Sequence, residues 1–218
     1  MNASQDRRQT RATYDFLSRW YDLLSGPAED RARQQAVELL DIRAGDIIME
    51  IGSGTGSSSV EMGSKVGSGG YVCALDLSSK MLDVAQRKLL RKGLGKRVGL
   101  VWGDAIHLPM PSHAVTGILI SFTLELFAEA EISLVLAECR RVFRKGGRMC
   151  VLSMSRQRPN APLIKPYEWL HEHFPAWFDC RPILLRQTLE KHGYRVIKAR
   201  QSSIFGLPVE TVLTDLNP

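Results

Sequence analysis

Several features that would assign this chain to a common class are absent from its sequence. No apolar run approaches the roughly 18 residues of a membrane-spanning helix. The first twenty residues contain arginines but no apolar core, so a secretory signal is not expected. No CxxC pair of the kind found in zinc ribbons occurs among the four cysteines, Cys73, Cys139, Cys150 and Cys180. We therefore expect a cytoplasmic protein without a metal site or a disulfide framework.

Charge of one sign does not dominate. Lysine and arginine number 29 against 23 acidic residues, which gives a formal net charge of +6. Much of the positive charge lies within residues 87–97 and 140–148, each at the predicted end of a helix, where cations complement the helix dipole. Alternatively, these basic residues make peripheral contact with an anionic membrane surface. These cations are not interleaved with aromatic residues, so no specific nucleic-acid partner is expected.

What is present is a regular alternation of strands and helices. Residues 47–51 form a short apolar run, which is typical of a strand buried on both faces of a parallel sheet. The other predicted strands are 71–75, 98–101, 115–121 and 149–154, and the predicted helices are 30–40, 57–65, 132–143 and the segment between Ser79 and Gly93. This order predicts an α/β fold, a Rossmann-like doubly wound sheet with helices on both faces.

Two of these helices have a predicted buried face. In the helix after Ser79 it consists of Met81, Leu82, Ala85 and Leu89. In the helix 132–143 the candidate core positions are Leu134, Leu136, Ala137 and Val142. We expect Gly146-Gly147 to close that second helix before the strand at 149–154 begins.

After residue 155 the composition changes. Residues 156–182 hold five prolines and a group of aromatic residues, and we expect them to form a cap segment within the domain. A helix over 183–191 and a hairpin of strands 194–202 and 207–214 are predicted to follow. Together with an amino-terminal helical lid over 1–29, these segments form a single domain, residues 1–218.

The strongest motif follows the first predicted strand and reads Glu50-Ile51-Gly52-Ser53-Gly54-Thr55-Gly56. Glycines at this place allow a sharp turn and a close approach of the backbone to a ligand. The spacing G-x-G-x-G differs from the G-x-G-x-x-G of dinucleotide sites, and the Gly-Lys-Ser/Thr of a P-loop is absent. An acid two residues before the first glycine suits a ligand that carries an ammonium group.

Polar residues also end the next three strands. Asp76 follows the second strand, where a carboxylate can accept hydrogen bonds from both ribose hydroxyls. Asp104 and Ala105 follow the third strand, in place to border an adenine, and Ser121 ends the fourth. Any one of these acids could serve only as a cap or turn residue. Because the carboxyl ends of parallel strands share one edge, the series predicts a common ligand crevice.

These motifs identify a resemblance. The runs EIGSGTG, CALD with LSSKMLDVAQ, GDAIHLPMP and ECRRVFRKGGR resemble class I S-adenosylmethionine-dependent methyltransferases, in detail the ubiquinone/menaquinone biosynthesis C-methyltransferase family. The resemblance covers residues 14–155. It implies a seven-stranded sheet of order 3-2-1-4-5-7-6 with strand 7 antiparallel, and S-adenosyl-L-methionine as the cofactor.

The resemblance also implies roles for residues. Gly52, Gly54 and Thr55 would surround the methionine part, with Glu50 beside them. Asp76 would hold the ribose, Asp104 and Ala105 would border the adenine, and Ser121 would line the pocket floor. Tyr21 would close over the cofactor from the amino-terminal segment, because Tyr21-Asp22 matches a Tyr-Asp pair of the family.

The chain departs from the family after the fourth strand. Phe122-Thr123-Leu124-Glu125-Leu126-Phe127 stands where quinone methyltransferases have a Gly-x-Arg-Asn-Val type of segment. Glu125 is a candidate base beside the methyl site, or else a capping or solvent-facing residue. His171, in the cap segment, is a second candidate base or an ordinary loop histidine. No Asn-Pro-Pro-Tyr occurs here, which argues against methylation of adenine or glutamine amines.

Aromatic residues are dense in the amino-terminal and cap segments, where they form a satellite core, wall an apolar acceptor pocket, or do both. We therefore expect a small-molecule acceptor that is hydrophobic or amphiphilic, quinol-like or lipid-like. The alternatives are a hydrophilic metabolite or a macromolecule as acceptor, a non-catalytic adenosyl-binding partner subunit, and an NAD-linked oxidoreductase, which the glycine spacing disfavours. The sequence makes no prediction of the oligomeric state.

Overall fold

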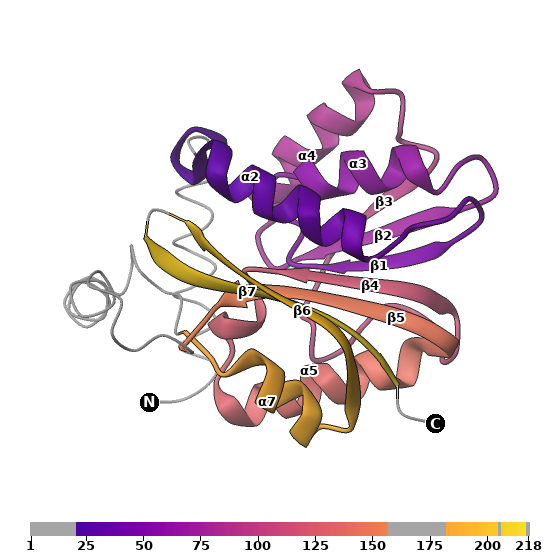
Figure 1. Ribbon diagram of the computed structural model, residues 1–218. Coiled ribbons are helices and arrows are strands. Elements are labelled where there is room, and N and C mark those ends of the chain that lie inside the picture. Colours follow the sequence, from indigo (N-terminus) through magenta and orange to yellow (C-terminus); the bar gives the residue numbers. More distant parts are fainter. Residues whose placement is uncertain (1–20, 157–181, 205, 217–218) are drawn as a thin grey trace.

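The computed structural model describes residues 21–156, 182–204 and 206–216 (Figure 1). Most of the predicted lid and cap segments, and with them His171 and Cys180, lie outside these residues. The predicted division into lid, cap and main body therefore stays a prediction. None of the helices in the described part is long and apolar enough to cross a membrane.

The elements follow one another in the predicted alternation. The first half contains α2 (Tyr21–Leu39), β1 (Ile47–Ile51), α3 (Ser57–Lys65), β2 (Tyr71–Asp76), α4 (Ser79–Arg91), β3 (Val98–Trp102) and β4 (Val115–Ser121). The second half contains the 3₁₀ turn η1 (Leu124–Leu126), α5 (Glu129–Val142), β5 (Phe143–Met154), α7 (Leu185–Lys191), β6 (Tyr194–Ile204) and β7 (Leu207–Leu216).

These strands form one seven-stranded sheet of order β3-β2-β1-β4-β5-β7-β6. The pairs among β1 to β5 are parallel, and β7 runs antiparallel to both β5 and β6. The fold class, the strand order and the antiparallel seventh strand predicted from the sequence are confirmed. Because β1, β2 and β4 end side by side, the segments that follow them meet at one edge of the sheet.

Helices cover the two faces of the sheet and bury two apolar layers. Helices α2, α3 and α4 lie over one face, and α5 and α7 lie over the other (Figure 1). The predicted face of α4 is confirmed, since Met81, Leu82, Ala85 and Leu89 are all buried. This helix begins where predicted, because the Ser78 hydroxyl accepts a hydrogen bond from the Met81 amide at 3.1 Å.

The predicted face of α5 is partly wrong. Leu134 is 53% exposed and Ala137 is also exposed. The buried stripe instead runs through Ile132, Val135, Leu136, Cys139 and Val142. These residues follow the i, i+3, i+4, i+7 spacing of one helix face. The predicted face was partly wrong because it included Leu134 and Ala137, which lie on the exposed side of the helix.

Two element boundaries also differ from the prediction. Helix α2 begins at Tyr21, well before the expected start at residue 30. Strand β5 begins directly after α5 at Phe143 and contains Gly146-Gly147, which we expected to separate a helix from a strand. A register shift between Val115 and Gly117 in the β4–β5 pairing marks this extra segment as a bulge, and Gly146 with φ +79° supplies its left-handed residue.

Candidate functional site

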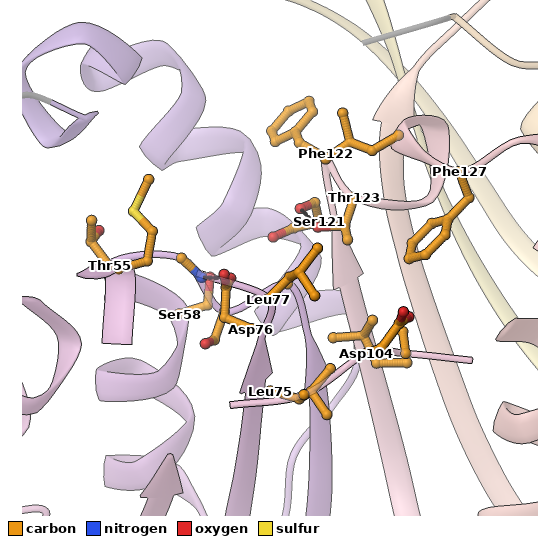
Figure 2. Close-up of a pocket in the computed structure, with 18 of the residues that line it drawn as sticks. Thr55, Ser58, Leu75, Asp76, Leu77, Asp104, Ser121, Phe122, Thr123 and Phe127 are labelled. Atoms are coloured by element: carbon orange, nitrogen blue, oxygen red, sulfur yellow. Dashed lines mark hydrogen bonds between the residues drawn. The ribbon is translucent and has the colours of Figure 1, made fainter. Parts of the chain in front are cut away.

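A cavity opens where β1, β2, β3 and β4 end, with about 1040 Å³ of empty space including its mouth. Its walls come from the glycine turn after β1, the ends of β2 and β4, the segment after β3, and the residues that follow β4. Figure 2 shows side chains from these segments around one space. A crevice at the carboxyl ends of parallel strands is where open α/β sheets bind ligands.

The glycine turn is held in place by the end of β2. The backbone amides of Gly52 and Ser53 both donate to the Leu75 carbonyl, at 2.9 and 3.0 Å. The Gly54 amide donates to Asp76 Oδ2 at 2.7 Å. Gly52 has φ +74°, and a Cβ there would lie 2.0 Å from Thr123 Oγ1, so only glycine fits.

The second and third glycines of the motif differ in their surroundings. Gly54 has φ +52°, lines the cavity, and would place a Cβ in open space. Gly56 does not line the cavity, and a Cβ there would lie 2.8 Å from the Ala85 Cβ of α4. Gly56 therefore serves the close packing of α3 on α4, while Gly52 and Gly54 shape the surface that faces a ligand.

Asp76 contacts backbone amides of the protein and also the cavity. Its carboxylate accepts hydrogen bonds from the Gly54 amide and, at 2.8 Å, from the Ser78 amide. It also lines the cavity. A carboxylate can accept about four hydrogen bonds, and a ligand hydroxyl in the cavity could donate one of them.

The segment after β3 carries Asp104 and Ala105 into the cavity wall. It is clamped from α5, because Arg141 donates to the carbonyls of Met110 and Leu108 at 2.8 and 3.0 Å. The Leu108 amide in turn donates to Glu138 Oε2 at 2.8 Å. Arg141 and Glu138 also bond each other, and this guanidinium lowers the pKa of the Glu138 carboxyl.

The residues after β4 form the opposite wall. Ser121 and Phe122 line it together with Thr123 and Phe127. Phe122 has φ +49°, which is unusual for a residue with a side chain and turns the chain away from β5. The Thr123 hydroxyl donates to the Ser121 carbonyl at 2.8 Å and closes this turn.

Hydroxyl groups and two cations surround the glycine turn. Lys88 Nζ of α4 donates to Thr55 Oγ1 at 3.0 Å and to Ser57 Oγ at 3.2 Å. The Ser53 hydroxyl is buried in the cavity wall, and in the described part of the chain its oxygen has no hydrogen-bond partner. A buried polar atom of this kind usually has a partner, which a ligand would supply.

Arg33 is the cation that we did not predict. It projects from α2 into the cavity wall, pairs with Glu29 and Asp30 at 2.5 and 3.1 Å, and its guanidinium carbon lies 5.8 Å from the centre of the Phe122 ring. We predicted a helix over residues 30–40 but assigned no role to its polar side. The available sequence signal was that Arg33 follows Glu29 by four residues and Asp30 by three. This spacing predicts ion pairs along the helix, but it does not predict where the helix lies relative to the cavity.

Two acids predicted for the site do not line the cavity. Glu50 is 1% exposed and accepts a hydrogen bond from the Ser59 hydroxyl of α3, behind the glycine turn. Burial raises its pKa to about 8. Glu125 is also 1% exposed, and its Oε1 accepts the Met154 amide at 3.1 Å. Burial raises its pKa to about 7.

The remaining predicted residues divide as follows. Tyr21 begins α2, but its side chain is not among those described, and His171 lies outside the described residues. In the described ranges no group of three or more His, Cys, Asp or Glu residues could hold a metal ion. The residues that the structure brings to one cavity are Gly52, Gly54, Thr55, Asp76, Asp104, Ala105 and Ser121.

This geometry can hold an elongated ligand with one polar and one apolar end. Asp76 and Asp104 supply acid groups to the cavity lining, and Leu77, Met81 and Ala105 supply apolar surface. The Trp102 indole donates to the Leu77 carbonyl at 2.9 Å and holds that segment. Arg33 and the Ser53 hydroxyl lie at the glycine turn.

Comparison with known sequences agrees with this site. The model of a family described as the ubiE/COQ5 methyltransferase family matches residues 9–198. A demethylmenaquinone methyltransferase of Lactobacillus johnsonii is 33% identical over 152 residues, which is 70% of this chain and 59% of that protein. The ubiquinone/menaquinone biosynthesis C-methyltransferase UbiE of Cellvibrio japonicus is 31% identical over 157 residues, 72% of this chain and 61% of that protein. The chain thus spans about three fifths of the length of these relatives.

Solved structures show the same fold at low identity. A SAM-dependent methyltransferase from Aquifex aeolicus superposes with a TM-score of 0.68 at 19% identity, over 90% of this chain and 97% of that one. The [4+2]-cyclase SpnF superposes with a TM-score of 0.69 at 14% identity, over 85% of this chain and 79% of that one. Because one of these proteins is described as a cyclase, the fold by itself does not determine the reaction.

Proposed function

Since the chain belongs to the ubiE/COQ5 methyltransferase family, we propose that it transfers a methyl group from S-adenosylmethionine to a small hydrophobic acceptor with a quinol-like ring. Family membership confirms the resemblance that the four motifs indicate. The observation that carries the proposal is that seven predicted cofactor residues from four separate segments line one cavity.

The residues around the cavity fit this cofactor. Asp76 bonds the Gly54 and Ser78 amides and lines the cavity, where its carboxylate would accept hydrogen bonds from ribose hydroxyls. Asp104 and Ala105 would border the adenine, on a segment that Arg141 holds. The methionine part would lie against Gly52 and Gly54, whose positive φ angles leave the backbone bare.

Charge at the glycine turn suits the amino-acid end of the cofactor. Arg33 in the wall is a partner for its carboxylate, and the Ser53 hydroxyl can supply or accept one more hydrogen bond. Glu50 stays a predicted partner for the ammonium group; its contact with Ser59 also makes it a support for α3. Tyr21 stays a predicted cover for the site.

The cofactor supplies an electrophilic methyl group on a sulfonium. The residues of the chain then have to hold the acceptor carbon in line with it, because alignment and proximity are the main contributions an enzyme makes to such a displacement. A phenolic hydroxyl on the acceptor makes the neighbouring ring carbon nucleophilic. Glu125 and His171 stay candidates for the group that receives a proton.

The acceptor is proposed to be apolar because of what lies after β4. Phe122, Leu126 and Phe127 from the segment after β4 line the cavity. Such a surface suits a ring rather than a hydrophilic metabolite. The names of the relatives, which refer to quinone biosynthesis, agree with this choice.

We also propose that the protein is located in the cytoplasm. Cys73, Cys139 and Cys150 are buried free thiols, as expected in a reducing cytoplasm. A lipid-soluble acceptor also implies contact with a membrane surface. Basic residues of the two clusters lie in the last turns of α4 and α5, where they complement the helix dipoles, and Lys88 and Arg141 among them bond other parts of the protein, so we do not assign the clusters to that contact.

One experiment tests the proposal directly. The protein is incubated anaerobically with S-adenosylmethionine carrying a labelled methyl group and with a panel of quinols, phenols, lipid amines and hydrophilic metabolites, and the products are identified by mass spectrometry. We expect label on a ring carbon of a quinol. Label transferred only to a hydrophilic acceptor, or to none of the panel while the cofactor binds, would contradict the proposal.

A further inference from the structure

The two outermost strands of the described sheet, β3 and β6, differ in how their edges are protected (Figure 1). Strand β6 carries the exposed cations Arg195, Lys198 and Arg200, and charges of this kind guard an edge against pairing with another chain. Strand β3 reads Val-Gly-Leu-Val-Trp and contains no charged residue and no proline. It thus lacks the side chains by which natural proteins prevent edge-to-edge pairing.

Large apolar side chains are exposed along the β3 edge. Of the six that are exposed among the described residues, three lie here: Trp102 of β3, at 59%, Tyr71 of β2 and Leu90 of α4. Leu90 lies over the turn that leads into β3, since its Cδ2 would be 3.7 Å from a Cβ on Gly95. The Tyr71 phenol lies over Gly99, where a Cβ would collide with its hydroxyl. An aromatic ring over an edge glycine is a surface on which a further strand can pack.

The backbone groups of Leu100 point away from the sheet. The Val72 amide donates to the Arg97 carbonyl, and the Gly103 amide donates to the Asp76 carbonyl. The odd-numbered residues from 97 to 103 therefore bond β2, because alternate residues of a parallel strand direct their N–H and C=O groups to the same neighbour. Leu100 is one of the residues between them, so its N–H and C=O face the outer side of the sheet.

A second copy of β3 fits this edge in one antiparallel register. If a two-fold axis passes through Leu100, each Leu100 exchanges both backbone hydrogen bonds with its copy. Val98 then stands opposite Trp102 of the second copy, which pairs a β-branched residue with an aromatic one on the face that packs under α4. Gly99 stands opposite Val101 of the second copy on the other face, where an aromatic ring covers the glycine.

Charges beyond the two ends of β3 favour the same register. Lys96 and Arg97 precede the strand, and Asp104 follows it. Continued past the strand ends, the antiparallel register places Lys96 opposite Asp104 of the second copy, twice in the pair of chains. A parallel arrangement would bring cations against cations. Strand β6 contains cations and no acid, so pairing with its own copy would bring like charges together.

We propose that β3 is a homodimer interface, at which two copies of the chain join their sheets by antiparallel β3–β3 pairing about Leu100. The proposal does not depend on the reaction. The paired edge consists of one five-residue strand and the side chains beside it, which is less than a standard interface, so the dimer is weak and depends on concentration. Residues 103–105, which continue from β3 into the cavity wall, would lie next to the second copy.

The first test is sedimentation equilibrium of the full chain between about 1 and 500 µM. We expect a monomer–dimer equilibrium with a dissociation constant of roughly 10–100 µM. Lys96→Glu places an acid opposite an acid at both ends of the paired strands, so it should raise this constant about fivefold to tenfold. Lys198→Glu, the same change on the other edge strand, is the matched control and should leave it unchanged. Leu100→Lys puts two cations at the axis and should abolish the dimer over this range.

The second test addresses the register. In the proposed pair, two cysteines introduced by Leu100→Cys have Cα atoms about 5.5 Å apart across the axis, which is within reach of a disulfide. Mild oxidation should therefore give a covalent dimer. Ile197→Cys is the control on β6, where the side chain is also exposed, and it should stay largely monomeric. The wild-type protein, oxidised in parallel, measures the background from the natural cysteines.

Several results would overturn the interface. These are a protein that stays monomeric over the whole concentration range, a dimer whose dissociation constant is the same in Lys96→Glu and the wild type, and equal cross-linking of Leu100→Cys and Ile197→Cys. If circular dichroism shows that Leu100→Lys does not fold, Lys96→Glu and the cross-link still decide. None of these measurements involves methyl transfer, so the interface and the proposed function fail separately.

Discussion

At the scale of residues, Gly54 allows a ligand-facing turn to be distinguished from a simple connector. Its φ is +52°, and a Cβ there would meet no atom of the protein within 4 Å. Gly93, after α4, is in the same situation, with φ +67° and open space around it, but it does not line the cavity. The two glycines therefore impose the same conformational requirement on an alanine and differ only in what lies in front of them.

We predict that Gly54→Ala and Gly93→Ala each cost about 1–2 kcal/mol of unfolding free energy, the cost of a left-handed residue with a side chain. Only Gly54→Ala should also weaken S-adenosylmethionine binding, by about tenfold or more, because its methyl group occupies ligand space. Chemical denaturation and titration calorimetry measure the two quantities. Equal cofactor affinities in the two variants would mean that the turn only connects β1 to α3.

Asp76 leads to a second prediction. Asp76→Asn removes one of the acceptor oxygens that bond the Gly54 and Ser78 amides, so we expect some loss of stability as well as an affinity for S-adenosylhomocysteine weaker by about 1.5–3 kcal/mol. An analogue of this ligand that lacks both ribose hydroxyls separates the two effects. Its affinity should change much less, and a loss as large as that for the parent ligand would argue against ribose binding.

Glu50 predicts a pH dependence of stability. Burial raises its folded pKa to about 8, well above the usual value of 4.5, so the folded state holds a proton that the unfolded state releases. Stability from this group is therefore complete below about pH 4.5 and is lost as the pH rises towards 8. Glu50→Gln should gain stability relative to the wild type between pH 5 and 8 in urea unfolding. A difference independent of pH would show that the carboxyl is ionised in the folded protein.

At the scale of elements, local patterns predicted most helices and strands, and failed where two elements meet. The face of α4 followed from its apolar spacing and from the cap at Ser78. The face of α5 did not, because Leu134 and Ala137 are as apolar as the residues that are buried, and only the position of the sheet decides between them. Glycines at 146 and 147 suggested a break, whereas the β4–β5 register absorbs them in a bulge.

The contact between α5 and the segment after β3 was also beyond sequence reasoning, because it joins residues about thirty positions apart. It yields a prediction. Arg141→Lys should weaken S-adenosylmethionine binding about threefold to tenfold, since a lysine cannot bond the Leu108 and Met110 carbonyls and Glu138 in one planar arrangement. Calorimetry measures the affinity.

Arg140→Lys is the matched control on the same helix. Arg140 donates to the His192 carbonyl and lies 5.4 Å from the centre of the Tyr194 ring, on the side of α7 and β6. Its replacement should cost stability without changing cofactor affinity. If both variants bind the cofactor as the wild type does, the segment around Asp104 is held by its own backbone and does not depend on the clamp.

At the scale of the whole molecule, the alternation of strands and helices predicted the fold class, and the resemblance supplied the strand order. The cofactor residues at strand ends could be predicted because parallel strands bring their carboxyl ends to one edge. Arg33 could not, since it reaches the cavity from α2. Its role depends on how that helix packs on the sheet.

Ligand binding should stabilise the whole fold, because the cavity joins segments from β1 to α5. We predict that S-adenosylhomocysteine at about a hundred times its dissociation constant adds about 2.7 kcal/mol of unfolding free energy and raises the melting temperature. NAD at the same concentration should leave the melting temperature unchanged, because the glycine spacing does not suit a pyrophosphate. A larger shift with NAD would favour the oxidoreductase alternative.

The antiparallel β7 has a consequence for the order in which the protein folds. It lies inside the sheet between β5 and β6, yet it is made last among the strands, because β5 ends at Met154 and β7 begins only at Leu207. Until those residues have left the ribosome, β5 is an open edge whose apolar side chains and backbone groups have no partner. The half of the sheet that forms the cofactor cavity can pair earlier, so the nascent chain passes through a stage in which a ligand-binding half precedes a complete sheet. During that stage β5 is the segment most exposed to pairing with another chain.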